Sequence, residues 1–489
     1  MRQGHAERLS AADTAFLRME SRTLHMHVGS LFVFAPPASG EAGFARFAQL
    51  VRSRLHLVPR YRQRLAQPPT PLGTPVWVDD PHFDLSFHVR HASLPRPGSM
   101  EQLTEYATRI LTRQLDRQRP LWELYFIEGL EDGGFALLAK SHQAMIDGLE
   151  GVDIATVILD LSSDGSEELE APEPWEPRPA PSSSSLALDS LGQLAASPAA
   201  LVDAGQRAVQ TPLRATARAL ELGRGATDMV RERLAHPPPP SLLNQRPGAQ
   251  RRFAIRRLAF SDVREVKDTF RTTVNDVVLA VVADATGRYL RSRGARTDGL
   301  WLRAMVPVST RTDADEHALG SRVVAVFVDL PMFEMDPVER LHVCHEAMQE
   351  VKSSHHAVGA GFLVELSGFA PPTLHAMAGR LGARGRLFSF LLTNVPGPQV
   401  PVYCLGARLQ GAYPFTPLGA SQSYSVGLTS IDGWLSFGIT ADYDACPGIE
   451  QVGEFLETGL AELVEHAGAA RERSLRHTPQ PGGPRRIDA

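Results

Sequence analysis

The sequence predicts a two-domain α/β protein, and three observations support that prediction. The chain has 489 residues, of which 43% are hydrophobic and 21% are charged, as expected of a globular protein with a large core. A stretch rich in acidic residues, proline and serine, which begins at residue 162, separates two halves of comparable size. In both halves, short apolar runs typical of strands occur beside segments of helical periodicity.

These features predict four consecutive regions. We expect a first domain over residues 1–161, then a solvated linker and two or three connecting helices over residues 162–245. A second domain is predicted over residues 246–470. The polar segment of residues 471–489, rich in proline and glycine, is predicted to be a disordered tail.

The charge pattern argues against several classes of function. The net charge is −5, and lysine occurs only at Lys140, Lys267 and Lys352. No basic stripe with interleaved aromatic residues is present, so no nucleic-acid partner is expected. The three cysteines, Cys344, Cys404 and Cys446, are too few and too widely spaced for a disulfide framework or a usual zinc site. No metal is therefore predicted. The polar start of the chain and the absence of a run of 18 apolar residues predict no signal peptide and only peripheral membrane contact.

Several elements of the first half follow from local patterns. A helix is predicted to start near Ser10, and the alternation over residues 26–34 predicts a strand. A helix over residues 100–114 places apolar residues on one face, with Ser99 as its cap.

The stretch from Gly134 to Leu161 is the one around which the first half is organised. Gly134 to Ala139 is a short apolar run that predicts a strand buried on both faces. Residues 140–148 are predicted to turn, and residues 148–161 have helical spacing. His142 and Asp147 therefore lie where a strand passes into a helix, a position from which side chains can reach a ligand.

The second half shows comparable local signals. Residues 251–260 predict a strand that is followed by a helix near Ser261. The pair Thr273 and Asp276 has the spacing of a capping box that opens a buried helix. Pro396-Gly397 suits a type II turn, and Ile431-Asp432-Gly433 predicts a hairpin between two strands.

Four motifs resemble those of the bacterial wax ester synthase/acyl-CoA:diacylglycerol acyltransferases. The stretch His142-Gln143-Ala144-Met145-Ile146-Asp147-Gly148 is similar to the HHxxxDG signature, with Gln143 in the place of its second histidine. Pro120-Leu121-Trp122 is similar to the PLW motif, and Asn275-Asp276 to the ND motif. Leu392 to Pro398 resembles the NVPGP segment. The matches extend from about residue 8 to residue 465, the linker excepted.

The resemblance implies a fold and an activity. It implies two similar domains of the CoA-dependent acyltransferase type, with mixed sheets and a tunnel between the domains. The implied activity is the transfer of an acyl group from acyl-CoA to a long-chain alcohol or to diacylglycerol, giving wax esters or triacylglycerol. Acyl-CoA would be a substrate, and no cofactor is expected. We expect a cytoplasmic location, with peripheral contact at the inner membrane face or at lipid droplets.

The same resemblance implies roles for particular residues. Position 143 corresponds to the catalytic base, and its motif neighbours His142, Asp147 and Gly148 would complete that part of the site. The aspartate would hold the turn through an ion pair. The wall of the site would be formed by Asn275, Asp276, Pro120, Leu121 and Trp122.

Gln143 leaves the activity open on chemical grounds. An imidazole, with a free pKa of roughly 6.5, accepts the proton of an attacking hydroxyl near neutral pH, and such help contributes about 10²- to 10⁴-fold in rate. An amide offers only hydrogen bonds. Because neighbours on extended backbone point to opposite faces, His142 is expected to pack away from the reacting centre. His27 is a candidate replacement base. The alternatives are a catalytically impaired acyl-CoA- or lipid-binding homologue and an engineered inactive variant.

Other interpretations of the motifs also stay open. Trp122 could pack in the core and need not touch the substrate, and Asp276 could serve as a helix cap, as a part of the site wall, or as both. His355-His356 begins a run similar to HHxxxDG, but it follows a predicted helix and lacks the preceding strand.

Overall fold

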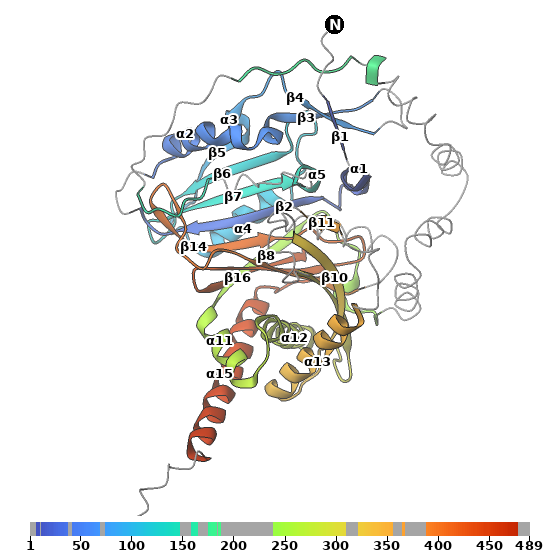
Figure 1. Ribbon diagram of the computed structural model, residues 1–489, viewed down its shortest axis with the longest axis vertical. Helices are drawn as coiled ribbons and strands as arrows, with labels where there is room; N and C mark the ends of the chain where they lie inside the picture. The colour runs from blue at the N-terminus through green and yellow to red at the C-terminus, as the bar shows by residue number, and fades with distance from the viewer. Residues whose placement is uncertain are drawn as a thin grey trace, which may run out of the picture.

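The protein is built around two mixed β-sheets (Figure 1). The computed structural model describes residues 6–9, 11–37, 42–68, 74–146, 158–164, 175–182, 184–186, 238–309, 321–355, 364–366 and 388–477. Helices α2 and α3 lie on the outer side of the first sheet, and α11, α12, α13 and α15 lie on the outer side of the second.

The first sheet has six strands, which are in order β13 (Tyr403–Cys404), β14 (Ala407–Phe415), β2 (His27–Phe34), β7 (Phe135–His142), β6 (Trp122–Glu128) and β5 (Val89–Ser93). Only β5 and β6 pair in parallel. Every residue of β7 is buried, because β7 lies between β2 and β6 and both faces of the sheet are covered. This confirms the predicted doubly buried strand.

The helices of the first half are α1 (Ala11–Met19), α2 (Phe44–Arg54), α3 (Leu85–His88), α4 (Met100–Leu111) and α5 (Gln143–Ile146). A small sheet combines β1 (Glu7–Arg8), β4 (Val76–Asp79) and β3 (Gln63–Ala66), and 3₁₀ turns cover Leu55–Leu57 and Pro59–Arg62. Ser99 caps α4 in a reciprocal capping box with Gln102. The predicted cap is confirmed, and the helix ends three residues before the predicted limit.

The second sheet has seven strands, in order β11 (Val364–Leu366), β10 (Ser321–Pro331), β9 (Trp301–Ser309), β12 (Phe390–Pro396), β15 (Tyr424–Ile431), β16 (Trp434–Asp442) and β8 (Arg251–Ala259). Strand β12 pairs in parallel with β9 and β15, and the other pairs are antiparallel. Asp432 and Gly433 form the two-residue turn between β15 and β16, both with positive φ, which confirms the predicted hairpin.

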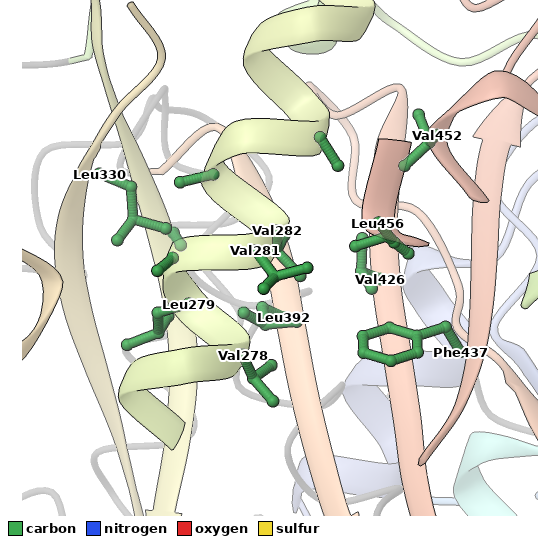
Figure 2. Packing of buried hydrophobic residues seen from close by; sticks show 14 of the residues in the cluster. Val278, Leu279, Val281, Val282, Leu330, Leu392, Val426, Phe437, Val452 and Leu456 are labelled. Carbon is green, nitrogen blue, oxygen red and sulfur yellow. The ribbon is translucent and has the colours of Figure 1, made fainter. Parts of the chain in front are cut away.

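Helices α11 (Phe260–Phe270), α12 (Val274–Ser292), α13 (Pro337–His355) and α15 (Gln451–His477) cover the second sheet, and a 3₁₀ turn at Leu242–Asn244 precedes it. Helix α12 has a long buried face, and the core of this half is built around it. Figure 2 shows Val278 and Val282 beside Leu392 of β12 and Phe437 of β16, with Leu456 of α15 close by. A helix with this much apolar surface is stable only when neighbours cover it on several sides.

Strand β14 joins the two halves. It follows β12 in the sequence, yet it pairs antiparallel with β2 in the first sheet. It also pairs with β13 and packs on β15, β16 and β8 of the second sheet, where Gly427 and Gly438 are directly paired. A Cβ atom at Gly438 would lie 1.9 Å from the carbonyl oxygen of Pro414, so the glycine lets β14 approach this closely. The predicted α/β fold with two mixed sheets is therefore confirmed. The sequence did not indicate that a strand of the second half would join the first sheet.

Two predictions about local structure need correction, and a third is largely untested. Gly397 does not adopt positive φ, so Pro396-Gly397 is not a type II turn; the glycine is required because a Cβ atom would lie 2.5 Å from the Ile431 side chain. Helix α15 continues through Glu472 to His477, so the predicted disordered tail begins as helix, and residues 478–489 lie outside the described part. Most of the predicted connecting helices also lie outside it.

The predicted solvated linker is anchored where the structure describes it. Arg178 donates hydrogen bonds from its guanidinium and its backbone N–H to the buried carboxylate of Asp79. Trp175 lies against the guanidinium of Arg62, with 5.1 Å from the Arg62 Cζ atom to the ring centroid. These residues therefore pack on the first half, although most of residues 175–182 are exposed.

Candidate active site

The central motif lies where β7 passes directly into α5. His142 is the last strand residue and Gln143 is the first helical residue, so no separate turn intervenes. His142 is paired with His27 across the β2–β7 ladder. The backbone N–H of His142 donates to the carbonyl of Leu121 at 2.9 Å, and that of Gln143 donates to the carbonyl of Met26 at 2.8 Å. The entry into α5 is thus held by the neighbours of β7 on both sides.

His142 caps the helix that follows it. Its Nδ1 atom accepts the backbone N–H of Ala144 at 3.0 Å. Burial lowers the pKa of His142 to about 4, so the ring is neutral at pH 7 and carries its hydrogen on Nε2. Nε2 lies 3.7 Å from Oε2 of Glu20. His142 is therefore buried and serves as a helix cap, and its orientation relative to the reacting centre stays a prediction.

Glu20 connects His142, His27 and Arg117. Its Oε1 atom lies 3.2 Å from Nε2 of His27, and Oε2 accepts the Nε–H of Arg117 at 3.0 Å. Burial alone would raise the pKa of Glu20, but the contacts with His27, His142 and Arg117 lower it to about 2. The carboxylate is therefore ionised at neutral pH. Sequence reasoning missed Glu20 because no local pattern distinguishes it from other loop residues.

His27 is a poor replacement base in this environment. The side chain is fully buried between the rings of His25 and His142, whose centroids lie 5.6 Å and 5.8 Å from its own. Burial lowers the pKa of His27 to about 3, despite the neighbouring Glu20. Its role is therefore packing beside the motif.

The amide of Gln143 is the unusual group of this site. The residue is only 1% exposed, and in the described part of the chain neither Oε1 nor Nε2 has a hydrogen-bond partner. Leaving a buried polar group unpaired costs about 1–3 kcal/mol. Buried polar groups are normally paired by protein or water, and the resemblance implies a base at this position.

The Pro120–Trp122 segment adjoins this motif. Trp122 is fully buried, and its Nε1–H donates to the carbonyl of Tyr61 at 2.8 Å. Leu121 is also buried, and its carbonyl holds His142 as described above. Trp122 packs in the core with its indole N–H bonded inside the protein, and the role of Pro120–Trp122 as a site wall stays a prediction. The segment reaches the motif through backbone contacts.

The second predicted part of the site forms a separate hydrogen-bonded cluster. Asp276 accepts the backbone N–H of Thr273 at 2.8 Å, and its own N–H donates to Oγ1 of Thr273 at 3.3 Å, which confirms the capping box. Oδ2 of Asp276 also lies 2.7 Å from Nδ1 of His345. Nδ2 of Asn394 donates to Oδ1 of Asn275 at 2.8 Å, joining the ND pair to the NVPGP segment.

No hydrogen bond or ion pair within the described residues connects that cluster to His142 or Gln143. The role of Asn275 and Asp276 as a site wall stays a prediction. Asp147 and Gly148 lie outside the described residues, as does His356. His355 is the last residue of α13, so no strand precedes that second run.

The predicted helix over residues 148–161 is described only at its end. Residues 147–157 lie outside the described part. Asp160 forms an isolated antiparallel bridge with Tyr403 of β13, and its carboxylate pairs with Arg54 of α2 at 2.7 Å. The end of the predicted helix is therefore extended backbone attached to the edge of the first sheet.

None of the described helices is long and apolar enough to cross a membrane. In the same residues, no three side chains of histidine, cysteine, aspartate or glutamate are grouped as a metal site would require.

Comparison with solved structures defines the class of protein. The first condensation domain of the calcium-dependent antibiotic synthetase matches with a TM-score of 0.53 and 16% identity, covering 95% of this chain and 97% of that domain. That likeness shows the fold of the CoA-dependent acyltransferases. The wax ester synthase/diacylglycerol acyltransferase from Marinobacter aquaeolei VT8 matches with a TM-score of 0.67 and 28% identity, over 94% of this chain and all of that one.

Sequence comparison identifies the family within that class. The wax ester synthase/diacylglycerol acyltransferase catalytic domain matches residues 9–278, and the C-terminal domain of the same family matches residues 319–464. A Mycobacterium tuberculosis protein named as a probable diacylglycerol O-acyltransferase is 34% identical over 462 residues, 93% of this chain and 98% of the relative. The chain belongs to the wax ester synthase/diacylglycerol acyltransferase family, and it is an acyltransferase by that membership.

Proposed function

We propose that this protein transfers an acyl group from acyl-CoA to the hydroxyl of a long-chain alcohol or of diacylglycerol, with the reaction centred at Gln143. The observation that carries the proposal is the buried amide of Gln143, which has no partner in the described chain and occupies the base position of the family motif. The names of the relatives support the two acceptor classes.

The reaction is a single displacement at the thioester. The acceptor oxygen attacks the carbonyl carbon, a C–O bond forms, the C–S bond breaks, and CoA leaves with the proton that the hydroxyl gives up. Oε1 of Gln143 can accept a hydrogen bond from the hydroxyl and orient it, but an amide does not take the proton. The displacement needs no metal, no other cofactor and no covalent intermediate on the protein, so the rate should be unchanged by EDTA.

The surroundings do not restore the missing base. His142 precedes Gln143 in the chain, and His27 is paired with His142 across the β2–β7 ladder. Both are fully buried, and burial lowers the pKa of His27 to about 3 and that of His142 to about 4. A base with such a pKa accepts a proton weakly at pH 7. We therefore expect slow turnover in this chain.

The same observations support a second candidate, a homologue that binds acyl-CoA or lipid without turnover. In that case the Gln143 amide would hydrogen bond to the bound ligand and perform no chemistry.

Contact with a membrane or lipid-droplet surface is a separate proposal. Co-flotation of the protein with anionic phospholipid vesicles tests it.

The deciding experiment compares the native chain with Gln143→His. CoA release is measured with palmitoyl-CoA and either hexadecanol or diacylglycerol. We expect the variant to be at least about a hundredfold faster, because general-base help contributes about 10²- to 10⁴-fold. Gln118→His, which adds a histidine at an exposed position, is the matched control and should match the native rate.

Two other outcomes have distinct meanings. Equal, measurable rates in the native chain and in Gln143→His would place the base elsewhere and overturn the proposed role of position 143. The absence of CoA release in both, with palmitoyl-CoA still bound in an equilibrium titration, would support the binding function.

A further inference from the structure

His88 is a buried histidine outside every motif discussed above. It is the last residue of α3, a short helix whose start is capped by Asp84 through the backbone N–H of Ser86 at 2.9 Å. The next residue begins β5, which pairs with β6. The side chain is almost completely enclosed.

The contacts of His88 are directed at Trp122. Nδ1 lies 2.8 Å from the backbone carbonyl oxygen of Trp122, and the imidazole is stacked on the indole with centroids 4.6 Å apart and planes at 15°. Phe83 is stacked on His88 as well, at 5.3 Å and 11°. Because a carbonyl oxygen only accepts, Nδ1 must carry a hydrogen. Burial lowers the pKa of His88 to about 4, so the ring is neutral at pH 7 and its hydrogen is on Nδ1.

Trp122 is held on its other side by Tyr61. The indole N–H donates to the Tyr61 carbonyl at 2.8 Å, and the two rings meet edge to face at 5.2 Å. With His88 on the Trp122 carbonyl, both the side chain and the backbone of Trp122 are fixed. The preceding carbonyl, that of Leu121, holds the N–H of His142, and Gln143 is the next residue.

We propose that His88 is a positioning residue for the acyl-transfer site, acting through Trp122 and Leu121 on the backbone at position 142. The inference rests on the proposed function for its effect on rate. Its structural part, the neutral Nδ1–H ring that fixes the Pro120–Trp122 segment, can be tested without turnover.

The variants separate the hydrogen bond from the ring. His88→Phe keeps an aromatic ring and removes the donor, whereas His88→Asn keeps an N–H donor near Nδ1 and removes the ring. The matched controls are His91→Phe and His91→Asn, because His91 lies three residues further along on β5 with a side chain that is 45% exposed. All four substitutions are made in the Gln143→His chain, where CoA release is expected to be fastest.

We expect His88→Phe to lower kcat by about tenfold to a hundredfold with little change in KM, because small displacements of a reacting group cost about that much. The kcat of His88→Asn should lie close to that of the parent chain, because this variant keeps the N–H donor. The His91 variants should have the kcat of the parent chain. In the ¹⁵N-histidine spectrum at pH 7, the signal lost in His88→Phe should be that of a neutral ring protonated at Nδ1. Backbone hydrogen exchange at His142 should be faster in His88→Phe.

A kcat in His88→Phe within twofold of its parent would overturn the proposal, as would a His88 ring protonated at Nε2. If no chain releases CoA, the proposed function has failed, and hydrogen exchange then decides the inference. Faster exchange at His142 in His88→Phe alone supports the positioning role, and unchanged exchange overturns it.

Discussion

The carbonyl oxygen of Leu121 accepts the backbone N–H of His142 at 2.9 Å, so the Pro120–Trp122 segment is bonded to the residue that precedes Gln143. On the other side, the carbonyl of Met26 accepts the N–H of Gln143. The start of α5 is thus held by two backbone bonds, one from the residue before β6 and one from the residue before β2. Substitutions that disturb either neighbour should therefore change the site without touching the substrate.

The cap on α5 should depend on the acceptor atom at position 142. Asparagine is among the best N-caps and leucine is not, so His142→Leu should be less stable than His142→Asn by about 1 kcal/mol or more. Both variants remove the imidazole that lies beside Glu20, and of the two only asparagine keeps an acceptor for the N–H of Ala144. Urea unfolding measures the difference. Equal midpoints and slopes would show that His142 does not act as a cap.

The junction of the two halves should be sensitive at Gly438. An alanine there would place Cβ 1.9 Å from the Pro414 carbonyl oxygen, so β14 would have to move. We expect Gly438→Ala to lower the free energy of unfolding by about 1–3 kcal/mol. Gly468→Ala is the control: it lies on α15 with no atom within 4 Å of its Cβ position, and it should gain about 0.5–1 kcal/mol. Equal effects would contradict a close approach at Gly438.

The anchor of the linker should depend on Arg178. Its bonds to Asp79, together with one from Gln63, lower the pKa of Asp79 to about 2 although burial alone would raise it. Arg178→Ala should increase chymotryptic cleavage after Trp175 several-fold, mapped by mass spectrometry. It should also lower the melting temperature, because the buried carboxylate of Asp79 loses its bonds to the guanidinium. Arg109→Ala removes a wholly surface ion pair and should leave the cleavage rate as it is. Unchanged cleavage in Arg178→Ala would show that this anchor does not hold the segment.

Stability should fall as the pH is lowered from about 6.5 to about 4. His88 and His142 have folded pKa values near 4, below the unfolded value of about 6.5, so the unfolded chain binds more protons in this window. The stabilisation is complete above pH 6.5 and is lost as the pH falls through the folded pKa. His88→Phe should reduce the slope of the unfolding free energy against pH by about 1.4 kcal/mol per pH unit, because the chain then takes up one proton fewer on unfolding.

The measurement is urea unfolding at half-unit steps from pH 7 to pH 4. The control is His91→Phe, which replaces a histidine whose side chain is 45% exposed. A slope in His88→Phe equal to that of the native chain would mean that His88 is not a buried neutral ring.

Elements whose signals lie within a few residues could be predicted. The cap at Ser99 and the capping box of Thr273 with Asp276 each depend on residues within four positions, and both form as predicted. The Asp432-Gly433 hairpin likewise needs only its two turn residues. Gly397 shows the limit of this reasoning. Pro396-Gly397 was predicted to form a turn, but the glycine instead allows close packing against Ile431.

The sequence by itself determined the family resemblance, the local elements and the presence of an amide where the family has its base, because each depends on residue types at short spacing. Only the tertiary structure decided that Glu20 and Arg117 meet beside His142, that His88 supports Trp122, and that β14 joins the first sheet. Those contacts join residues far apart in the chain, and which of many possible pairings forms depends on how the sheets pack, which no local pattern records.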